Sequence, residues 1–314
     1  MAYLGQRIKG QEKIHERLIT ALQKRSFPHA LLFSGPSGVG KKKMAWALAQ
    51  NLLCDKSLPA CGECFSCKRV EKEESESVLF ISPKTLQIKI DEVRGITGFL
   101  ALQTSARAKI VIVDEADRLN LQAVNSLLKI VEEPPLKSFF FFISPSPSRL
   151  PVTLRSRLQT LRFKKLPVSV IRDLTSEEGW LISAAQGRMD VINQLKDKKE
   201  LRTLSLELWK KIFVKDTLPF AMNFPLELKD RKQALFVSQS WQWLLRDGRM
   251  MKAGEKSGFI HGDQESLRGQ IALMPTGALD FLIQQVLLME RNLRAYMDCI
   301  LCFEHFALSL QQCL

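Results

Sequence analysis

Residues 30–43 read ALLFSGPSGVGKKK, and this stretch decides the fold. The apolar run from Ala30 to Ser34 leads into a glycine-rich loop, and a helical pattern over Lys42 to Leu53 follows the loop. Strand, glycine-rich loop and helix in this order are the context of a phosphate-binding loop, whose backbone N–H groups and lysine hold phosphate oxygens. The residues expected in that role are Gly35, Gly38, Gly40 and Lys41, followed by Lys42.

Lys42 departs from the pattern of a complete phosphate loop, in which Ser or Thr follows the lysine and its hydroxyl binds Mg²⁺. An ammonium has three donors and no lone pair for a metal. Hydrolysis is therefore expected to be weak or absent, while nucleotide binding through the backbone and Lys41 stays open. Lys42 either pairs with Asp114 in place of the cation or contacts phosphate. In a third interpretation ATP and Mg²⁺ still bind through Asp114, although the ammonium would repel the metal.

Two further apolar runs, Ile110 to Val113 and Phe139 to Ile143, have the length of buried strands. Helical patterns over residues 91–102 and 121–131 alternate with them, and Asn120 is suited to cap the second helix. Pro134 and Pro135 end that helix. Strands alternating with helices predict the α/β class, with a parallel sheet covered by helices.

The run at 110–113 ends in Asp114 and Glu115. In nucleotide-hydrolysing sites an Asp at this place holds Mg²⁺ and the following Glu positions the attacking water. The alternative is a strand that ends in two solvated acids. Because Lys42 removes the hydroxyl, the two carboxylates are interpreted as remnants of that machinery.

Strand signals fade after about Phe163, and helical periodicity prevails from there on. A short helical unit is expected to about Lys199. From Leu201 the helical pattern is broken at 216–225 and at 248–262. The last segment, 278–314, carries an apolar stripe that is expected to be core: Leu282, Val286, Leu293, Met297, Ile300 and Leu301.

Four of the seven cysteines follow one another with the spacing C-x6-C-x2-C-x2-C: Cys54, Cys61, Cys64 and Cys67. Four thiolates at short spacing predict a closed tetrahedral site for structural zinc. The alternatives are four reduced thiols in an exposed loop or, on ligand count alone, an iron–sulfur cluster. Cys299 and Cys302 lie on an apolar helical stretch and are expected to pack in the core.

The net charge of +13 indicates a polyanionic partner such as nucleic acid, contacted through its phosphates. The alternative is a scatter of solvated lysines, because the basic residues are spread along the chain. The first residues show no signal peptide and no apolar run reaches membrane-spanning length, so a cytosolic protein without a membrane partner is expected.

Together these residues resemble bacterial DNA polymerase III clamp-loader subunits of the AAA+ family, along the whole chain. The landmarks in family order are the phosphate loop, the cysteine module, the segment 110–117 and the stretch NSLLKIVEEPP at 125–135. Ser144 occupies the place of the family's sensor 1 residue. Ser156, Arg157 and Leu158 stand where the family has Ser-Arg-Cys, so Leu158 is a departure.

The resemblance implies an AAA+ domain (1–165) with an inserted zinc module (54–67), a small helical lid (166–200) and a helical collar (201–314) that joins subunits in a ring. It also implies bacterial, cytoplasmic DNA replication. The partners would be delta and gamma/tau subunits, indirectly the sliding clamp, and the backbone of primed DNA.

Lys42 fits the delta-prime type of this family, which does not hydrolyse ATP and offers the arginine of its Ser-Arg motif, here Arg157, to a neighbouring motor subunit. Asp190 stands where the motor subunits have a sensor 2 arginine, and Arg188 would substitute only with a register shift. Two alternatives stay open: an active gamma/tau-type ATPase, and a zinc-stabilised DNA-binding scaffold.

Overall fold

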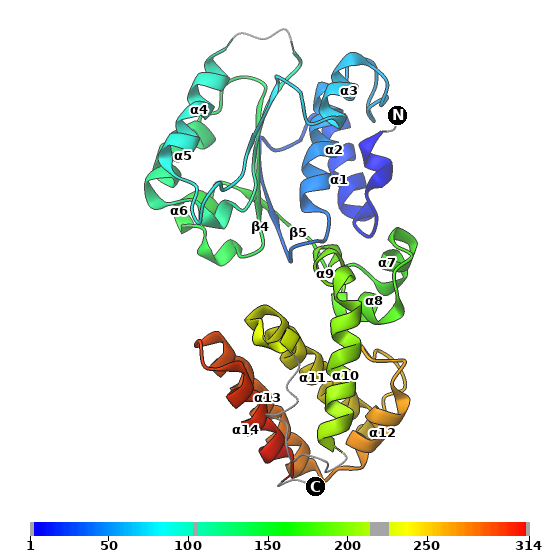
Figure 1. Ribbon diagram of the computed structural model, residues 1–314. Coiled ribbons are helices and arrows are strands. Elements are labelled where there is room, and N and C mark those ends of the chain that lie inside the picture. The colour runs from blue at the N-terminus through cyan, green and yellow to red at the C-terminus, as the bar shows by residue number, and fades with distance from the viewer. Residues whose placement is uncertain (1–2, 103–105, 214–225, 312–314) are drawn as a thin grey trace. The chain divides into compact units, whose positions relative to one another are not determined.

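A computed structural model describes residues 3–102, 106–213 and 226–311. The chain folds into two compact units (Figure 1). The N-terminal unit comprises Met1–Leu174 and Gln186–Asp190, and the C-terminal unit comprises Thr175–Ala185 and Val191–Leu314. The finer division into AAA+ domain, lid and collar stays a prediction.

A parallel five-stranded sheet forms the centre of the N-terminal unit, with strand order β2-β3-β4-β1-β5. The central strands β1, β3 and β4 are almost wholly buried because helices cover both faces, as parallel sheets require. The strands are β1 (Ala30–Ser34), β2 (Val78–Ile81), β3 (Lys109–Val113), β4 (Ser138–Ser144) and β5 (Gln159–Arg162).

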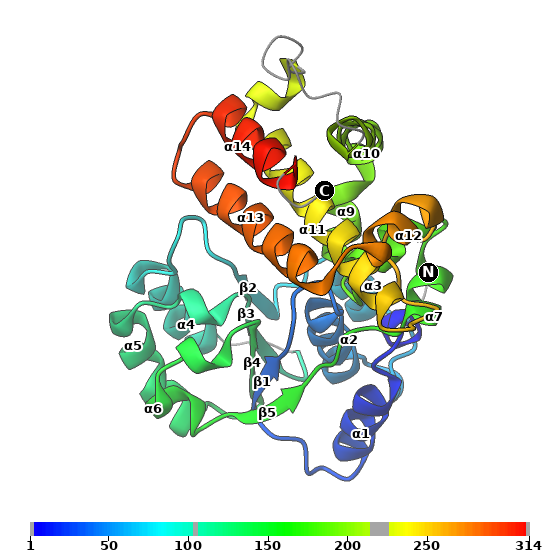
Figure 2. The same ribbon diagram turned by 90° about the horizontal axis from the view of Figure 1, so that it is seen from below.

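The helices lie on two sides of this sheet, and side chains alternate between the two layers (Figures 1 and 2). Leu32 and Phe140 pack on the side of α4 and α5, whereas Leu31 and Phe141 pack on the side of α1 and α2. The helices of this unit are α1 (Glu12–Gln23), α2 (Lys41–Leu53), α3 (Phe65–Glu71), α4 (Ile90–Ala101), α5 (Leu121–Glu132), α6 (Val152–Arg155) and α7 (Val168–Leu174), with 3₁₀ turns η1 (Leu4–Arg7), η2 (Ala116–Arg118) and η3 (Pro147–Arg149).

The predicted α/β class is confirmed, and so are the strands expected from apolar runs and the two helices expected between them. Asn120 caps α5 as predicted, because its Oδ1 accepts a hydrogen bond from the Ala123 N–H at 2.8 Å. The sequence patterns missed β2 and β5. Both lie at sheet edges, and β5 (QTLR) has a single apolar residue, so no strand pattern is visible in it.

The C-terminal unit is helical and has its own core around the ring cluster of Trp209, Trp241, Phe303 and Phe306. Among the described residues no single helix is long and apolar enough to cross a membrane; α12 and α13 pass that test only as a pair, bent by 117°. The helices are α8 (Gly179–Ala185), α9 (Met189–Leu195, of which Met189 and Asp190 belong to the N-terminal unit), α10 (Lys199–Phe213), α11 (Arg231–Lys252), α12 (Glu265–Leu273), α13 (Thr276–Arg294) and α14 (Cys299–Gln311), with 3₁₀ turns η4 (Lys196–Lys198) and η6 (Leu226–Lys229).

Two expectations for this unit were wrong in detail. Gly248 does not break the helix, since α11 continues to Lys252; a Cβ at Gly248 would lie 2.3 Å from Cγ2 of Ile271, so the glycine permits close packing on α12. The stripe over 278–314 is interrupted between α13 and α14, where Tyr296 has a φ of +65°. This break resets the helical phase.

Because of that reset the stripe is only partly core. Leu282, Val286 and Leu293 are buried as expected, while Met297 and Leu301 are exposed. Cys299 and Cys302 are buried, as predicted. The expected break at 216–225 lies wholly outside the described residues.

Candidate functional site

The glycine-rich loop connects the end of β1 to the start of α2 and depends on backbone angles that favour glycine. The φ angles are +146° at Gly35, +72° at Gly38 and +95° at Gly40. Gly40 is the N-cap of α2 and offers no side chain to the N–H groups of the first turn. These N–H groups have no partner within the helix and form the positive end of its dipole. They can therefore bind an anion.

Lys41 turns its side chain back onto the loop. Its Nζ donates hydrogen bonds to the carbonyl oxygens of Gly35 at 2.6 Å and Pro36 at 2.5 Å. Burial lowers the pKa of the Lys41 ammonium, and the carboxylates of Asp114 and Asp190 act against that shift. The lysine is thus placed at the predicted phosphate site, where its own loop satisfies two of its donors.

Lys42 points elsewhere. Its Nζ lies 3.4 Å from Oε2 of Glu73 and 4.3 Å from the ring centroid of Phe80. Within the described part of the chain its ion pair is with Glu73, so the pair with Asp114, one of the arrangements considered from the sequence, is not formed. Burial raises the pKa of Asp114, and the Lys42 charge, acting at longer range, opposes that shift.

Asp114 and Glu115 follow β3 at the same sheet edge as the loop, because all strands are parallel. Burial raises the pKa of Asp114, and the Glu115 N–H, which donates to its Oδ1 at 3.0 Å, opposes that shift. Oε2 of Glu115 is ion-paired with Arg118 at 2.7 Å. The carboxylate expected to position water is therefore engaged with a neighbouring cation.

Ser144 ends β4 and is fully buried. Its hydroxyl donates to Oδ1 of Asp117 at 2.8 Å and accepts a hydrogen bond from the Ser146 N–H. The site therefore includes Asp117, a residue for which the sequence pattern predicted no role. No spacing signal marks it, because the contact joins two loops that are far apart in sequence.

The segment 186–190 packs directly on the loop. The Met189 N–H donates to the Gly38 carbonyl at 3.1 Å, and Arg188 is ion-paired with Asp190 at 2.7 Å. A Cβ atom at Gly38 would lie 2.1 Å from Oδ1 of Asp190. The sequence identified Asp190 as the departure from a sensor 2 arginine, but it did not predict this contact with Gly38.

Arg157 lies in the turn after α6, with its side chain one-third exposed. Its Nε donates to Oε1 of Glu132 at 2.6 Å, its Nη2 contacts the same oxygen, and its Nη1 donates to the Thr153 carbonyl at 2.5 Å. The guanidinium is thus held against α5 of its own chain. Leu158, the departure from the family motif, is buried among the residues that pack under α5 and α6.

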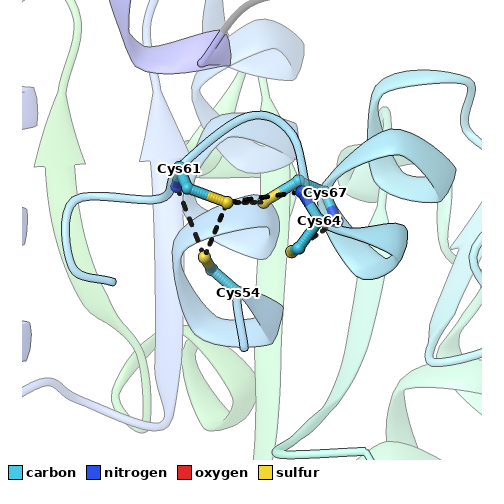
Figure 3. A group of neighbouring side chains, drawn as sticks. All are labelled: Cys54, Cys61, Cys64 and Cys67. Carbon is cyan, nitrogen blue, oxygen red and sulfur yellow. Dashed lines mark hydrogen bonds between the residues drawn. The ribbon is translucent and has the colours of Figure 1, made fainter. Parts of the chain in front are cut away.

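The four cysteines gather into one cluster between α2 and α3 (Figure 3). Their sulfur atoms all lie within 4.8 Å of one another, with 3.7 Å between Cys54 and Cys61 and 4.0 Å between Cys61 and Cys67. Zinc–sulfur bonds of about 2.3 Å in a tetrahedron place sulfurs roughly 3.8 Å apart. The donor set and its spacing fit a closed zinc site.

Backbone N–H groups point at these sulfurs, as expected around thiolates. Burial by itself would raise the pKa of Cys54, but N–H groups of Cys61 and Ser57 donate to its sulfur and lower the pKa to about 6. Burial raises the pKa of Cys67. Backbone N–H groups of Glu63 and Cys64 also lower the pKa of Cys61. The cluster thus favours thiolates at Cys54 and Cys61 before a metal binds and displaces the remaining protons.

Two buried amides of α2 tie this cluster to the rest of the unit. Gln50 accepts from the Leu4 N–H at 2.8 Å and donates to the Cys67 carbonyl at 3.2 Å. Asn51 accepts from the Ala60 N–H at 2.9 Å and donates to the Tyr3 hydroxyl. The helix that begins at the phosphate loop therefore ends by positioning the cysteine module.

The chain is similar in sequence to subunits of bacterial DNA polymerase III. The tau subunit of DNA polymerase III from Bacillus subtilis is 34% identical over 198 residues, which cover 58% of this chain and 35% of tau. The delta' subunit from the same organism is 30% identical over 193 residues, covering 61% of this chain and 59% of delta'. A delta' subunit from Pseudomonas aeruginosa is 36% identical over 135 residues, 41% of each chain.

The matched region is thus less than two thirds of the length of these relatives. Among solved structures, a DNA polymerase III gamma subunit-related protein from Thermotoga maritima covers 95% of this chain and 99% of its own, with 16% identity and a TM-score of 0.46. The profile of the family described as DNA polymerase III, delta subunit, matches residues 10–167. The resemblance to clamp-loader subunits of the delta-prime and gamma/tau kind is confirmed, and the chain belongs to this DNA polymerase III subunit family.

Proposed function

We propose that the chain acts as a delta-prime-type stator of a bacterial, cytoplasmic clamp loader: it does not hydrolyse ATP and serves the motor subunit beside it. The observation that supports this most is the place of Lys42. The second residue of α2 presents an ammonium to Glu73 and Phe80, where an active loop presents a hydroxyl to Mg²⁺. The engagement of Lys41 with its own loop and of Glu115 with Arg118 points the same way.

The chemical contribution of the chain would come from Arg157. An arginine supplied in trans stabilises charge on a transferring phosphoryl group. Arg157 sits on a short turn at the surface, and its partner Glu132 is about half exposed. An ion pair this accessible to water is worth at most about 1 kcal/mol, so Glu132 orients the guanidinium without preventing a phosphate from binding it.

The remaining parts would hold the assembly together. Zinc at the four cysteines would be structural, because all four positions come from the protein and no open position is left for chemistry. Leu287 on α13 and Leu301 and Leu308 on α14 are exposed apolar residues that suit a helical contact with delta or gamma/tau subunits in a ring. The net charge of +13 suits contact with the backbone of primed DNA after the sliding clamp is opened.

Two other functions remain in view. The 34% identity to a tau subunit, with Lys41, Asp114 and Glu115 all present, favours an active gamma/tau-type ATPase. The net charge together with the cysteine cluster would also suit a zinc-stabilised DNA-binding scaffold. The scaffold leaves the paired Arg157 without a role.

ATP turnover separates the three. The purified chain is assayed alone and after mixing with delta and gamma/tau subunits, with clamp and primed DNA present. The stator predicts no turnover alone, and complex formation with strong DNA-stimulated turnover in the mixture. Turnover by the lone chain that is lost in Lys41→Ala would establish the ATPase instead. Tight DNA binding without any complex formation would establish the scaffold.

A further inference from the structure

We infer that Asp190 closes the phosphate loop to nucleotides: its carboxylate stands over Gly38 as a fixed anion and determines that this loop binds no polyphosphate. This shares a site with the stator role proposed above and deepens it, because it assigns the loss of nucleotide binding to a residue outside the loop. It concerns the isolated chain and needs no partner subunit.

The first support is contact. Oδ1 of Asp190 and the Asp190 backbone nitrogen lie 2.1 and 2.6 Å from the point that a Cβ at Gly38 would occupy. Real Cβ atoms essentially never have such contacts, so the glycine is what allows the acid to sit there. The Met189 N–H bond to the Gly38 carbonyl, 3.1 Å long, fixes the segment at the same residue. The middle of the loop is therefore covered by protein.

The second support is how the segment is held in place. Gly187 has a φ of +87°, and its carbonyl accepts a hydrogen bond from the Leu166 N–H at 3.0 Å. Arg188 then orients the Asp190 carboxylate through Nη2 at 2.7 Å and Nε at 3.2 Å. The backbone at Gly187 and the side chain of Arg188 thus both hold the Asp190 carboxylate at the loop. A freely solvated surface acid would have no such contacts.

The third support is charge. The loop collects the positive end of α2 and the Lys41 ammonium, the two features that attract phosphate. The Asp190 carboxylate acts on Lys41 together with Asp114 and Asp117, so the charges of three carboxylates are felt at one loop lysine. Arg188 is paired with Asp190, so its guanidinium is not free to hold a phosphate. A phosphate chain would meet a like charge at short range, which disfavours binding.

The test is equilibrium binding of a fluorescent ATP analogue with Mg²⁺ to the full chain. The wild type is compared with Asp190→Asn, which keeps the shape and removes the charge, and with Asp190→Ala, which also opens space. Asp197→Asn is the matched control, because Asp197 is an exposed acid seven residues further along the chain, in the 3₁₀ turn η4. Thermal melting of each protein verifies that it is folded.

We expect no saturable binding by the wild type or Asp197→Asn, and binding at least about tenfold tighter by both Asp190 variants. Adding Lys41→Ala to Asp190→Asn should remove the gain, which places the ligand in the loop. Wild-type binding equal to that of the variants would overturn the inference. So would folded Asp190 variants that bind no better than wild type. These outcomes are distinct from failure of the stator role, which is read from ATP turnover by the unmodified chain.

Discussion

Arg157 and Glu132 form an ion pair in which two guanidinium nitrogens, Nε and Nη2, meet the same carboxylate oxygen. The third nitrogen donates to the Thr153 carbonyl, so the whole side chain is held against α5 and α6. Glu132 is the last residue of α5 and belongs to the EEPP part of the family stretch. In the proposed stator this arrangement presents the arginine in a fixed direction before a motor subunit arrives.

Arg157→Ala should leave folding and assembly intact and lower the DNA-stimulated ATPase of the reconstituted complex. Removal of an in-trans arginine costs roughly a thousandfold or more at a single site, and other sites in the ring reduce the observed loss. Arg155→Ala, two residues earlier at the end of α6, is the control. Normal turnover with Arg157→Ala would refute the in-trans role.

Glu132→Gln should have a smaller effect of a different kind, because it frees the arginine without removing it. We expect a fall of about two- to tenfold in turnover at saturating ATP, with the ATP concentration for half-maximal rate unchanged. The adjacent Glu133, also exposed, provides the matched variant Glu133→Gln, which should behave as wild type. Equal effects of the two substitutions would argue against a positioning role for Glu132.

Zinc removal should destabilise the N-terminal unit, since metal binding by the four cysteines is coupled to the folding of the segment between α2 and α3. The purified chain should contain one zinc per molecule, and Cys64→Ser should lose it and lower the melting temperature by roughly 5 °C or more. Ser66→Ala, in the same module, should retain metal and stability. A metal-free wild type with unchanged melting would contradict a structural site.

Lys109 is buried at the start of β3, and its ammonium holds the end of α4. Its Nζ donates to the carbonyls of Phe99 at 2.9 Å and Leu100 at 3.0 Å, and also to the Leu102 carbonyl. Lys109→Met fills the space but leaves these acceptors without their donor. The free energy of unfolding should fall by about 1–3 kcal/mol, measured by urea denaturation. Lys129→Met, on the exposed face of α5, should change it little.

Features that are local in sequence were predictable, and features that depend on distant contacts were not. The phosphate loop and the cysteine cluster each lie within one short stretch, so their residue types and spacing were sufficient to propose them. The partners of Lys42, Arg157 and Asp190, which are Glu73, Glu132 and Gly38, each lie 25 or more residues away in the sequence. No periodicity in one sequence encodes which of many acids or glycines a long side chain will meet.

The same limit applies to the helices of the C-terminal unit. Apolar periodicity identified them, but it could not show that Tyr296 breaks the last segment or that Gly248 stays inside α11, because both depend on packing against other helices. It also gave no sign that His261 would be buried. A lone histidine between glycine-containing turns reads as a surface residue until the contacts around it are known.

His261 is fully buried in the C-terminal unit and makes this unit sensitive to acid. Its Nδ1 accepts from Arg202, its Nε2 faces the Ser240 carbonyl at 3.2 Å, and its backbone N–H donates to Asp247. Burial, with help from the Arg202 charge, lowers the pKa of His261 to about 4.

The unfolded chain therefore binds a proton between pH 6.5 and pH 4 that the folded chain excludes, so stability is present at neutral pH and is lost as the pH falls through this window. Between pH 7 and pH 5 the free energy of unfolding should fall by about 2 kcal/mol.

Urea denaturation followed by tryptophan fluorescence reports on this unit, because four of the five tryptophans lie in it: Trp180, Trp209, Trp241 and Trp243. In His261→Gln the free energy of unfolding should differ less between pH 7 and pH 5, by that same amount. Burial of Asp247 raises the pKa of its carboxyl, but it does so in both proteins alike. His305→Gln, at an exposed position on α14, should keep the wild-type pH dependence. An unchanged pH dependence in His261→Gln would show that the acid sensitivity arises elsewhere.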